Sequence, residues 1–194
     1  MKIAKISESF ISTLRKNNII NEDNAEIVKY GFELLILKAL FFVICIFIGV
    51  IMSEIIESIL FAASFTLLRS YAGGYHAKTK AKCFVLSLLT IIVALICCKL
   101  AVDFNWIIHV SLIISIISSV IIWIVAPVDT INKRLDELEI KMYKRKTRIV
   151  LIIEMCALVV LLLLNLDGIY FSIVLSIIAE LFLVITGLIS NQIQ

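Results

Sequence analysis

Six apolar runs dominate the chain and are separated by short polar or charged segments. They lie at about residues 34–53, 55–68, 84–102, 106–126, 149–166 and 169–188. Most have the roughly 20 residues that a helix needs to cross the hydrocarbon core of a bilayer. The pattern therefore predicts an all-α polytopic membrane protein with about six transmembrane helices.

The second run is short for a span. As a helix, residues 55–68 would cover only about 21 Å of a core that is about 30 Å thick. A short run can cross with the help of its flanking polar residues, can thin the bilayer locally, or can enter the bilayer only partway. Partial entry would draw the segment after it below the lipid headgroups.

Residues 1–33 form a polar N-terminal segment, cytoplasmic or interfacial, ahead of the first run. Within it Ile3, Ile6, Phe10 and Leu14 recur at near-helical spacing, with basic residues elsewhere. This predicts an amphipathic helix that lies in the membrane interface or packs as a cap on the cytoplasmic side of the helix bundle. The two alternatives stay open at this stage.

Residues 127–148 form a second amphipathic segment, between the fourth and fifth runs. Its apolar positions step by 4, 3 and 4 residues, which predicts a helix on the cytoplasmic surface with Asp129 or Thr130 as its N-cap. These positions are Ile131, Leu135, Leu138 and Met142. The basic end of the segment either anchors to anionic lipid or binds an acidic segment of a substrate. The candidates for substrate binding are Lys141, Lys144, Arg145 and Lys146.

Charge placement predicts the orientation in the membrane. Nearly all of the 18 Lys and Arg residues lie before the first run, in residues 69–83, or between the fourth and fifth runs. Six spans put these regions on one side, which the positive-inside rule assigns to the cytoplasm. Five spans would break this agreement. We therefore expect six spans with both termini in the cytoplasm, and keep four spans with two interfacial segments as the alternative.

Composition narrows the class of protein. With 62% hydrophobic residues and a mean hydropathy of +1.11, the chain lies outside the range of soluble domains. One Pro and six Gly leave no room for a linker, so residues 1–194 are expected to form a single membrane-embedded domain. The basic residues suggest no nucleic-acid-binding module, and no cofactor is expected.

One short stretch concentrates the residues that can do chemistry, namely residues 69–83, RSYAGGYHAKTKAKC. A thiol nucleophile needs a base within hydrogen-bond reach and neighbours that favour the thiolate. Cys83, His76 and the surrounding basic residues offer both. Thr79 is a suitable N-cap for the next run, which would put Cys83 near the positive end of a helix dipole. The other four cysteines lie inside apolar runs, where cysteine behaves as a small hydrophobe.

Spacing adds a constraint on this stretch. On one continuous helix His76 and Cys83 would sit about 10 Å apart along the axis, too far for proton transfer. The chain around His76 must therefore be non-helical, and Gly73 and Gly74 supply the freedom for a turn. Two alternatives are weaker. A structural zinc site needs four ligands rather than two, and a basic loop can serve as a topology anchor alone.

The string R-x-x-A-G-G-Y-H-A-K-T-x-x-x-C resembles the accessory gene regulator B (AgrB) family, integral membrane cysteine endopeptidases of Gram-positive quorum sensing. The rest of the chain agrees with that family in length, hydropathy and charge layout. The resemblance implies that His76 and Cys83 are catalytic. Arg69 and Gly74 also fall on motif positions that the family needs, and Gly73 lies beside them.

The resemblance also implies a reaction and partners. The enzyme would cleave the C-terminal tail of a short precursor peptide and, through an acyl-enzyme thioester, close a thiolactone or lactone ring. The precursor would be AgrD-like, with an amphipathic N-terminal part and an acidic tail, and the enzyme would act at the membrane lipid as a homodimer. Two rivals from other classes are a peptide exporter or channel component, and a thiol acyltransferase.

The sequence leaves the roles of three residues undecided. Asp129 could orient His76, although the role of helix cap is favoured. Arg69 could stabilise an oxyanion, grip a lipid phosphate or bind the precursor's carboxylates. Glu180 lies near the middle of the last run, where an ionisable side chain is costly and marks a functional candidate, and the sequence names no partner for it.

Overall fold

A computed structural model describes residues 2–17, 19–75, 77, 79–101, 105–129 and 135–193. Within these ranges the protein is all-helical, and its β structure is limited to one isolated bridge between Gly73 and Val128. The helices are α1 (Lys2–Lys16), α2 (Glu22–Met52), α3 (Ile55–Ala72), α4 (Lys80–Ala101), α5 (Asn105–Val125), α6 (Glu137–Leu163) and α7 (Asp167–Ile193). The predicted all-α class is confirmed.

The chain forms two compact units, residues 1–44 and 45–194, and the boundary falls inside α2. In the first unit, α1 packs on the start of α2. Phe10 stacks on Phe32 with ring centroids 4.0 Å apart, and Lys29 pairs with Glu8 at 3.1 Å. The amphipathic helix expected near the N-terminus is thus present and packed on a neighbouring helix. The expectation of one membrane-embedded domain stays a prediction.

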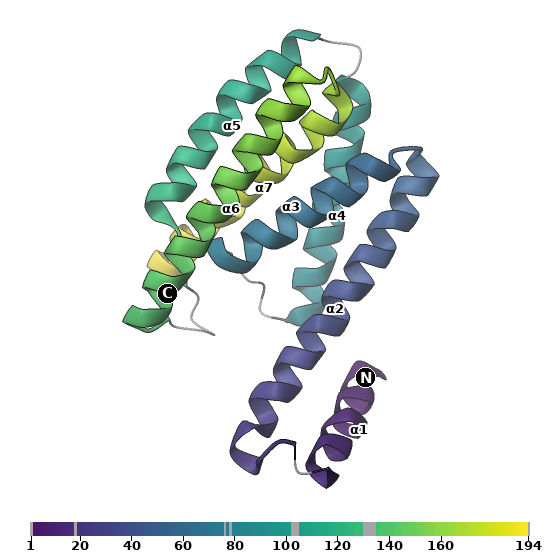
Figure 1. The fold of residues 1–194 in the computed structure, drawn as a ribbon, viewed down its shortest axis with the longest axis vertical. Coiled ribbons are helices and arrows are strands. Elements are labelled where there is room, and N and C mark those ends of the chain that lie inside the picture. Colours follow the sequence, from purple (N-terminus) through teal and green to yellow (C-terminus); the bar gives the residue numbers. More distant parts are fainter. Residues whose placement is uncertain are drawn as a thin grey trace. The chain divides into compact units, whose positions relative to one another are not determined.

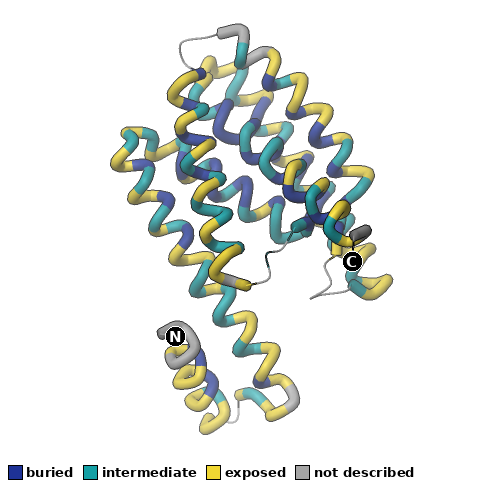
Figure 2. The backbone as a smooth tube through the Cα atoms, turned by 180° about the vertical axis from the view of Figure 1, so that it is seen from behind, coloured by how far each residue is buried: buried dark blue, intermediate teal, exposed yellow. Residues whose placement is uncertain are grey.

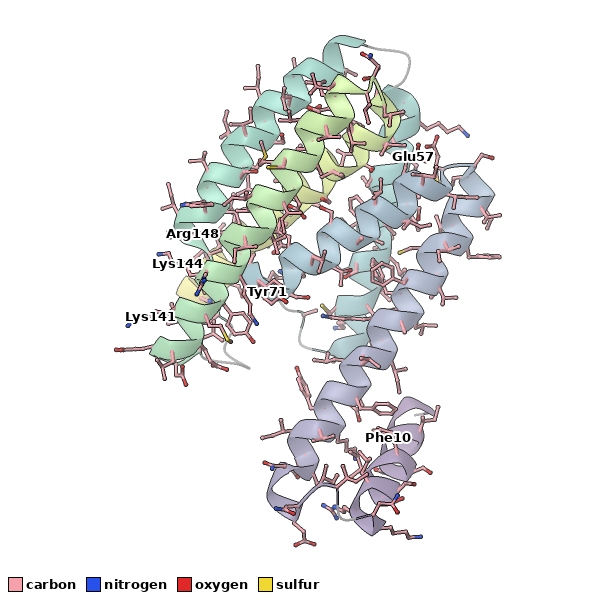
Figure 3. The ribbon with its side chains drawn as sticks, viewed as in Figure 1. Phe10, Glu57, Tyr71, Lys141, Lys144 and Arg148 are labelled. Carbon is pink, nitrogen blue, oxygen red and sulfur yellow. The ribbon has the colours of Figure 1, made fainter. Side chains whose placement is uncertain are left out.

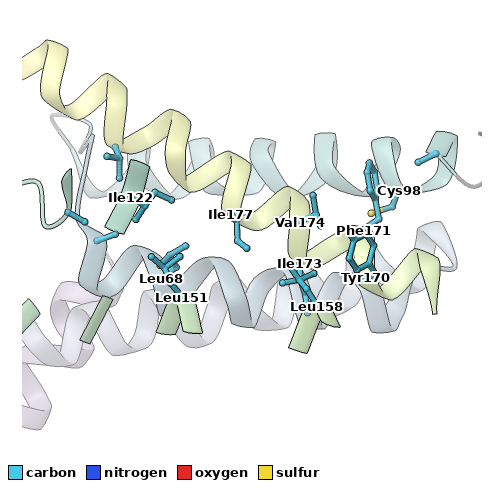
Figure 4. Packing of buried hydrophobic residues seen from close by; sticks show 14 of the residues in the cluster. Leu68, Cys98, Ile122, Leu151, Leu158, Tyr170, Phe171, Ile173, Val174 and Ile177 are labelled. Atoms are coloured by element: carbon cyan, nitrogen blue, oxygen red, sulfur yellow. The ribbon is translucent and has the colours of Figure 1, made fainter. Parts of the chain in front are cut away.

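The second unit is a bundle built around α7, which packs against α3, α4, α5 and α6 (Figure 1). The reason is composition, since α7 carries apolar or small side chains on every face. Its buried residues join those of α3 and α6 in one core cluster (Figure 4). Among them are Leu68, Leu151, Leu158, Tyr170, Val174 and Ile177.

Figure 2 shows exposed residues along the outside of this bundle, and many of them are large hydrophobic side chains. Large hydrophobic side chains such as Val93 on α4 and Ile113 on α5 are 58% and 59% exposed. Exposed apolar faces of this extent are typical of a surface that contacts lipid. The bundle thus carries hydrophobic residues both inside and outside, which indicates a membrane protein.

Four helices of the described chain are long and apolar enough to cross a membrane. They are Asn24–Met52, Ile55–Ala72, Ala81–Ala101 and Asp167–Asn191, and Val110–Val125 is a shorter apolar helix. The expected number of about six spans is not confirmed. The second run is longer than expected, because α3 continues to Ala72 and covers about 27 Å.

The basic segment has a different boundary from the predicted one. The N-cap of α6 is Asp136, whose side chain accepts a hydrogen bond from the Glu139 N–H at 2.6 Å, and Glu139 returns the bond to the Asp136 N–H. This reciprocal capping box satisfies two donors at the helix start. The prediction that Asp129 caps this helix is therefore wrong, and its alternative, Thr130, lies outside the described residues. The basic residues also share one helix with the apolar run after them, because nothing between Lys146 and Leu163 breaks the helix.

Candidate active site

A tight turn follows α3 and leads into the motif. Gly73 and Gly74 have φ angles of 77° and 98°, a region that other residues rarely adopt. The Gly74 N–H donates to the Val128 carbonyl at 3.0 Å, and the Val128 N–H donates to the Ala72 carbonyl at 2.9 Å. A Cβ atom on Gly73 would lie 2.1 Å from the Val128 oxygen. The predicted non-helical segment is confirmed for the described residues 73–75 and 77.

Helix α7 holds the other side of this turn. The Tyr75 N–H donates to the Leu183 carbonyl at 2.7 Å. A Cβ atom on Gly187 would approach Gly74 C and Tyr75 N to 2.6 Å each. The missing side chain of Gly187 therefore lets the backbone of the turn lie directly on the helix.

Arg69 lies near the C-terminus of α3, and its side chain stabilises the glycine turn that follows the helix. Its guanidinium donates hydrogen bonds to the carbonyl oxygens of Gly73 and Tyr75. The same group forms an ion pair with Glu180 on α7, with 3.7 Å between Nη1 and Oε1. The Arg69 side chain is only 14% exposed, so its charge faces the protein interior rather than the solvent. Arg69 is thus the ion-pair partner of Glu180.

Cys83 lies just beyond the first turn of α4. The Thr79 hydroxyl accepts a hydrogen bond from the Lys82 N–H at 3.3 Å, as expected for an N-cap. The Cys83 N–H bonds to the Thr79 carbonyl at 3.1 Å, and the residue is partly buried. The predicted cap is confirmed.

His76 lies outside the described residues, and its role as base stays a prediction. Its neighbours Tyr75 and Ala77 are non-helical and partly buried.

Asp129 directly follows Val128 and is exposed. Its carbonyl oxygen accepts a hydrogen bond from the Asn191 side-chain amide at 2.8 Å. Through Val128 it belongs to the end of the bundle that carries the turn. Its expected role in orienting His76 stays a prediction.

The basic residues of α6 lie near the end of α3. Lys146 Nζ is 5.2 Å from the Tyr71 ring centroid, a cation–π contact, and the Tyr71 and Tyr143 rings are 6.3 Å apart. Tyr71 is two residues before the turn. Figure 3 shows it beside the half of α6 that carries Lys141 and Lys144, whereas Glu57 marks the far end of α3. Lys141 and Arg145 are exposed and Lys144 is partly buried.

In the described part of the chain, no group of three or more His, Cys, Asp or Glu side chains lies close enough together to hold a metal ion. The site there consists of a helix-start cysteine, a clamped glycine turn and a nearby row of cations. These features define an α-helical membrane protein with a candidate thiol site at one end of its bundle.

The chain belongs to the accessory gene regulator B family, because the model of that family matches residues 7–185. Membership agrees with the long apolar helices in indicating a membrane protein. The resemblance seen in the motif is thereby confirmed. No solved structure matches the chain significantly.

Curated relatives carry names from the same family. A "Putative AgrB-like protein" of Clostridium perfringens strain SM101 is 29% identical over 147 residues, which are 74% of this chain and 64% of that protein. A second C. perfringens protein, from strain 13, is 26% identical over the same shares. An AgrB-like relative from Lactiplantibacillus plantarum is 25% identical over 45% of this chain and 44% of its own. The match thus spans less than two thirds of these relatives.

Sequence reasoning missed several residues that shape the site. Val128, Leu183 and Gly187 lie far from the motif in sequence, and two of them act through backbone atoms. Side-chain type carries no signal for a carbonyl that accepts a hydrogen bond. Glu180 was detectable because an ionisable residue within an apolar run is rare.

Proposed function

We propose that the protein is a membrane cysteine endopeptidase that removes the C-terminal tail of a short precursor peptide and cyclises the remainder. The observation that carries the proposal is the position of Cys83 at the Thr79-capped start of α4, the helix that follows the clamped turn in the chain. The family match supports the same substrate class.

The reaction has two transfers. His76 takes the proton from the Cys83 thiol, the sulfur attacks a peptide carbonyl of the precursor, and the tail leaves as an amine that receives the proton back. A thioester joins Cys83 to the precursor. A Cys thiol or Ser hydroxyl of the precursor then attacks that carbonyl, and the bond from the carbonyl carbon to the Cys83 sulfur breaks. The proton of the attacking group passes to the Cys83 sulfur, so the ring closes and the free thiol is regenerated.

Exchange between two thioesters is nearly balanced in free energy. Excluding water and positioning the second nucleophile therefore matter more than driving force. A partly buried cysteine in a membrane bundle suits this need.

Substitution of Cys83 tests the proposal. Cys83→Ala is expected to abolish cleavage of a precursor encoded beside the gene, and His76→Ala to reduce it by at least about a hundredfold. Mass spectrometry of wild-type enzyme trapped during turnover should find a peptide adduct on Cys83. Continued cleavage by Cys83→Ala would support the exporter or channel alternative, and a fatty acyl adduct would support the acyltransferase alternative.

The precursor's acidic tail is the proposed ligand of Lys141, Lys144, Arg145 and Lys146. The position of these residues supports this assignment, because the cation–π contact of Lys146 with Tyr71 puts this part of α6 beside the end of α3. Tyr71 in turn is two residues from the glycine turn. A tail bound there would lie next to a scissile bond held near Cys83.

We also propose six membrane crossings with the site and both termini in the cytoplasm. The bond between Gly74 and Val128 supports this topology, because it joins the connection between α3 and α4 to the connection between α5 and α6. Helices α4 and α5 therefore lead away from this end and back to it. The basic residues at this end favour the cytoplasmic side. Action as a homodimer is proposed from the family alone.

A further inference from the structure

We propose that Glu180 is a positioning residue, whose buried carboxylate holds the Arg69 guanidinium against the turn at residues 73–75 and so fixes the chain that leads into His76. Its catalytic consequence rests on the proposed function. The assignment itself rests on contacts among described residues.

The environment of Glu180 gives the first argument. Its side chain is fully buried, and in the described part of the protein neither carboxylate oxygen accepts a hydrogen bond. A buried carboxylate without hydrogen-bond donors is costly unless an opposite charge compensates it. The Arg69 guanidinium, 3.7 Å away, supplies that charge.

Arg69 needs the carboxylate for the complementary reason. Its guanidinium remains charged at any physiological pH and presents donors in a rigid planar fork. Two of these donors are engaged by the Gly73 and Tyr75 carbonyls. Carbonyl dipoles do not neutralise a full charge, so a guanidinium that is 14% exposed needs a countercharge on its inner side.

The position of Glu180 on α7 gives an independent argument. Glu180, Leu183 and Gly187 are spaced by three and four residues, which puts them on one face of the helix. The Glu180 carboxylate pairs with Arg69, and the Leu183 carbonyl accepts a hydrogen bond from the Tyr75 N–H. Gly187 has no side chain, which leaves room for the backbone of Gly74. One face of α7 is thus shaped to receive the turn.

The consequence concerns the base rather than the thiol. His76 is bonded directly to Tyr75, whose N–H and carbonyl are both fixed by this arrangement. Displacing a catalytic group by about 1 Å can cost about a hundredfold in rate. Glu180 would therefore affect catalysis without contacting substrate.

Glu180→Gln provides the test, because the 3.7 Å ion pair exceeds hydrogen-bond length and the substitution mainly removes charge. In purified protein in nanodiscs, we expect faster amide hydrogen exchange in residues 73–77 by mass spectrometry, and a fall in precursor cleavage of about tenfold to a hundredfold. Glu154→Gln is the matched control. That buried carboxylate accepts a hydrogen bond from Ser64 at 2.6 Å, which a Gln oxygen retains, so exchange at 73–77 should not change.

A double variant separates positioning from general stability. Arg69→Met with Glu180→Gln removes both charges, so thermal stability should recover relative to Glu180→Gln. Exchange at residues 73–77 should stay fast, because the two carbonyls have lost their donor. Unchanged exchange in Glu180→Gln, or slow exchange regained in the double variant, would overturn the inference. Fast exchange in Glu180→Gln beside a wild type that cleaves no precursor would refute the proposed peptidase while leaving the positioning role supported.

Discussion

Lys141, Lys144 and Arg145 place three positive charges on the first half of α6. They lie close in sequence to Lys146, which contacts Tyr71 at the end of α3. An exposed ion pair contributes only about 0.5 kcal/mol, because water screens it. Three such pairs acting on one flexible ligand are enough to change its affinity measurably.

Replacing these three residues with Gln is expected to raise the KM for the precursor about tenfold and to leave kcat nearly unchanged. The reason is that they would bind the departing tail rather than the reacting carbonyl. The difference from wild type should shrink in about 0.5 M NaCl, which screens exposed charges. Lys16→Gln, an exposed cation on α1, is the control and should leave KM unchanged. A fall in kcat alone would contradict tail binding.

At the scale of the element, α7 combines two tasks. Its buried apolar residues form the centre of the bundle, and its residues 180–187 carry the face that receives the turn. Gly187 belongs to that second task, because a side chain there would push against Gly74 and Tyr75. In an exposed helix the same change from Gly to Ala would add stability, by up to about 1 kcal/mol.

Gly187→Ala should therefore lower precursor cleavage, by about a hundredfold if the turn moves by about 1 Å. The protein should still insert and fold, since the turn can move outward. Gly168→Ala in the same helix is the matched control. Its Cβ would meet only the flexible Glu57 carboxylate at 3.3 Å, so activity should be retained. Equal activity of the two variants would show that the close approach at Gly187 is dispensable.

Within the 45–194 unit, chemically different segments gather at opposite ends of the bundle. The turn at 73–75, Val128, the start of α4 and the basic part of α6 share one end. Glu54, Glu57 and Lys99 belong to the other. There burial, followed by the nearby Glu57 carboxylate, raises the pKa of Glu54, while Lys99 lowers it.

Thiol labelling tests the proposed orientation of the whole molecule. In a background with the five native cysteines replaced by Ala, a membrane-impermeant maleimide should label Ser53→Cys in intact cells. Lys144→Cys should react only after the cells are opened, because its end carries the basic residues. Both positions lie outside the helix stretches that are long and apolar enough to cross a membrane. Labelling of Lys144→Cys in intact cells would contradict the cytoplasmic orientation.

Local patterns predicted much of this protein because their causes are local. Apolar runs predicted the helices, and Thr79 predicted the start of α4, since a cap acts within three residues. The paired glycines predicted the turn for the same reason. The Asp129 cap failed because a better local signal, the Asp136–Glu139 capping box, lies seven residues further on.

The sequence by itself determined the all-helical membrane class, the chemical identity of the candidate site and the helix start at Cys83, because each depends on residue type and short spacing. Only the tertiary structure decided that Arg69 pairs with Glu180, and that Val128, Leu183 and Gly187 enclose the glycine turn. Those contacts join segments 54 to 113 residues apart through charge, backbone atoms and excluded volume. Their geometry arises only when α3 and α7 pack side by side.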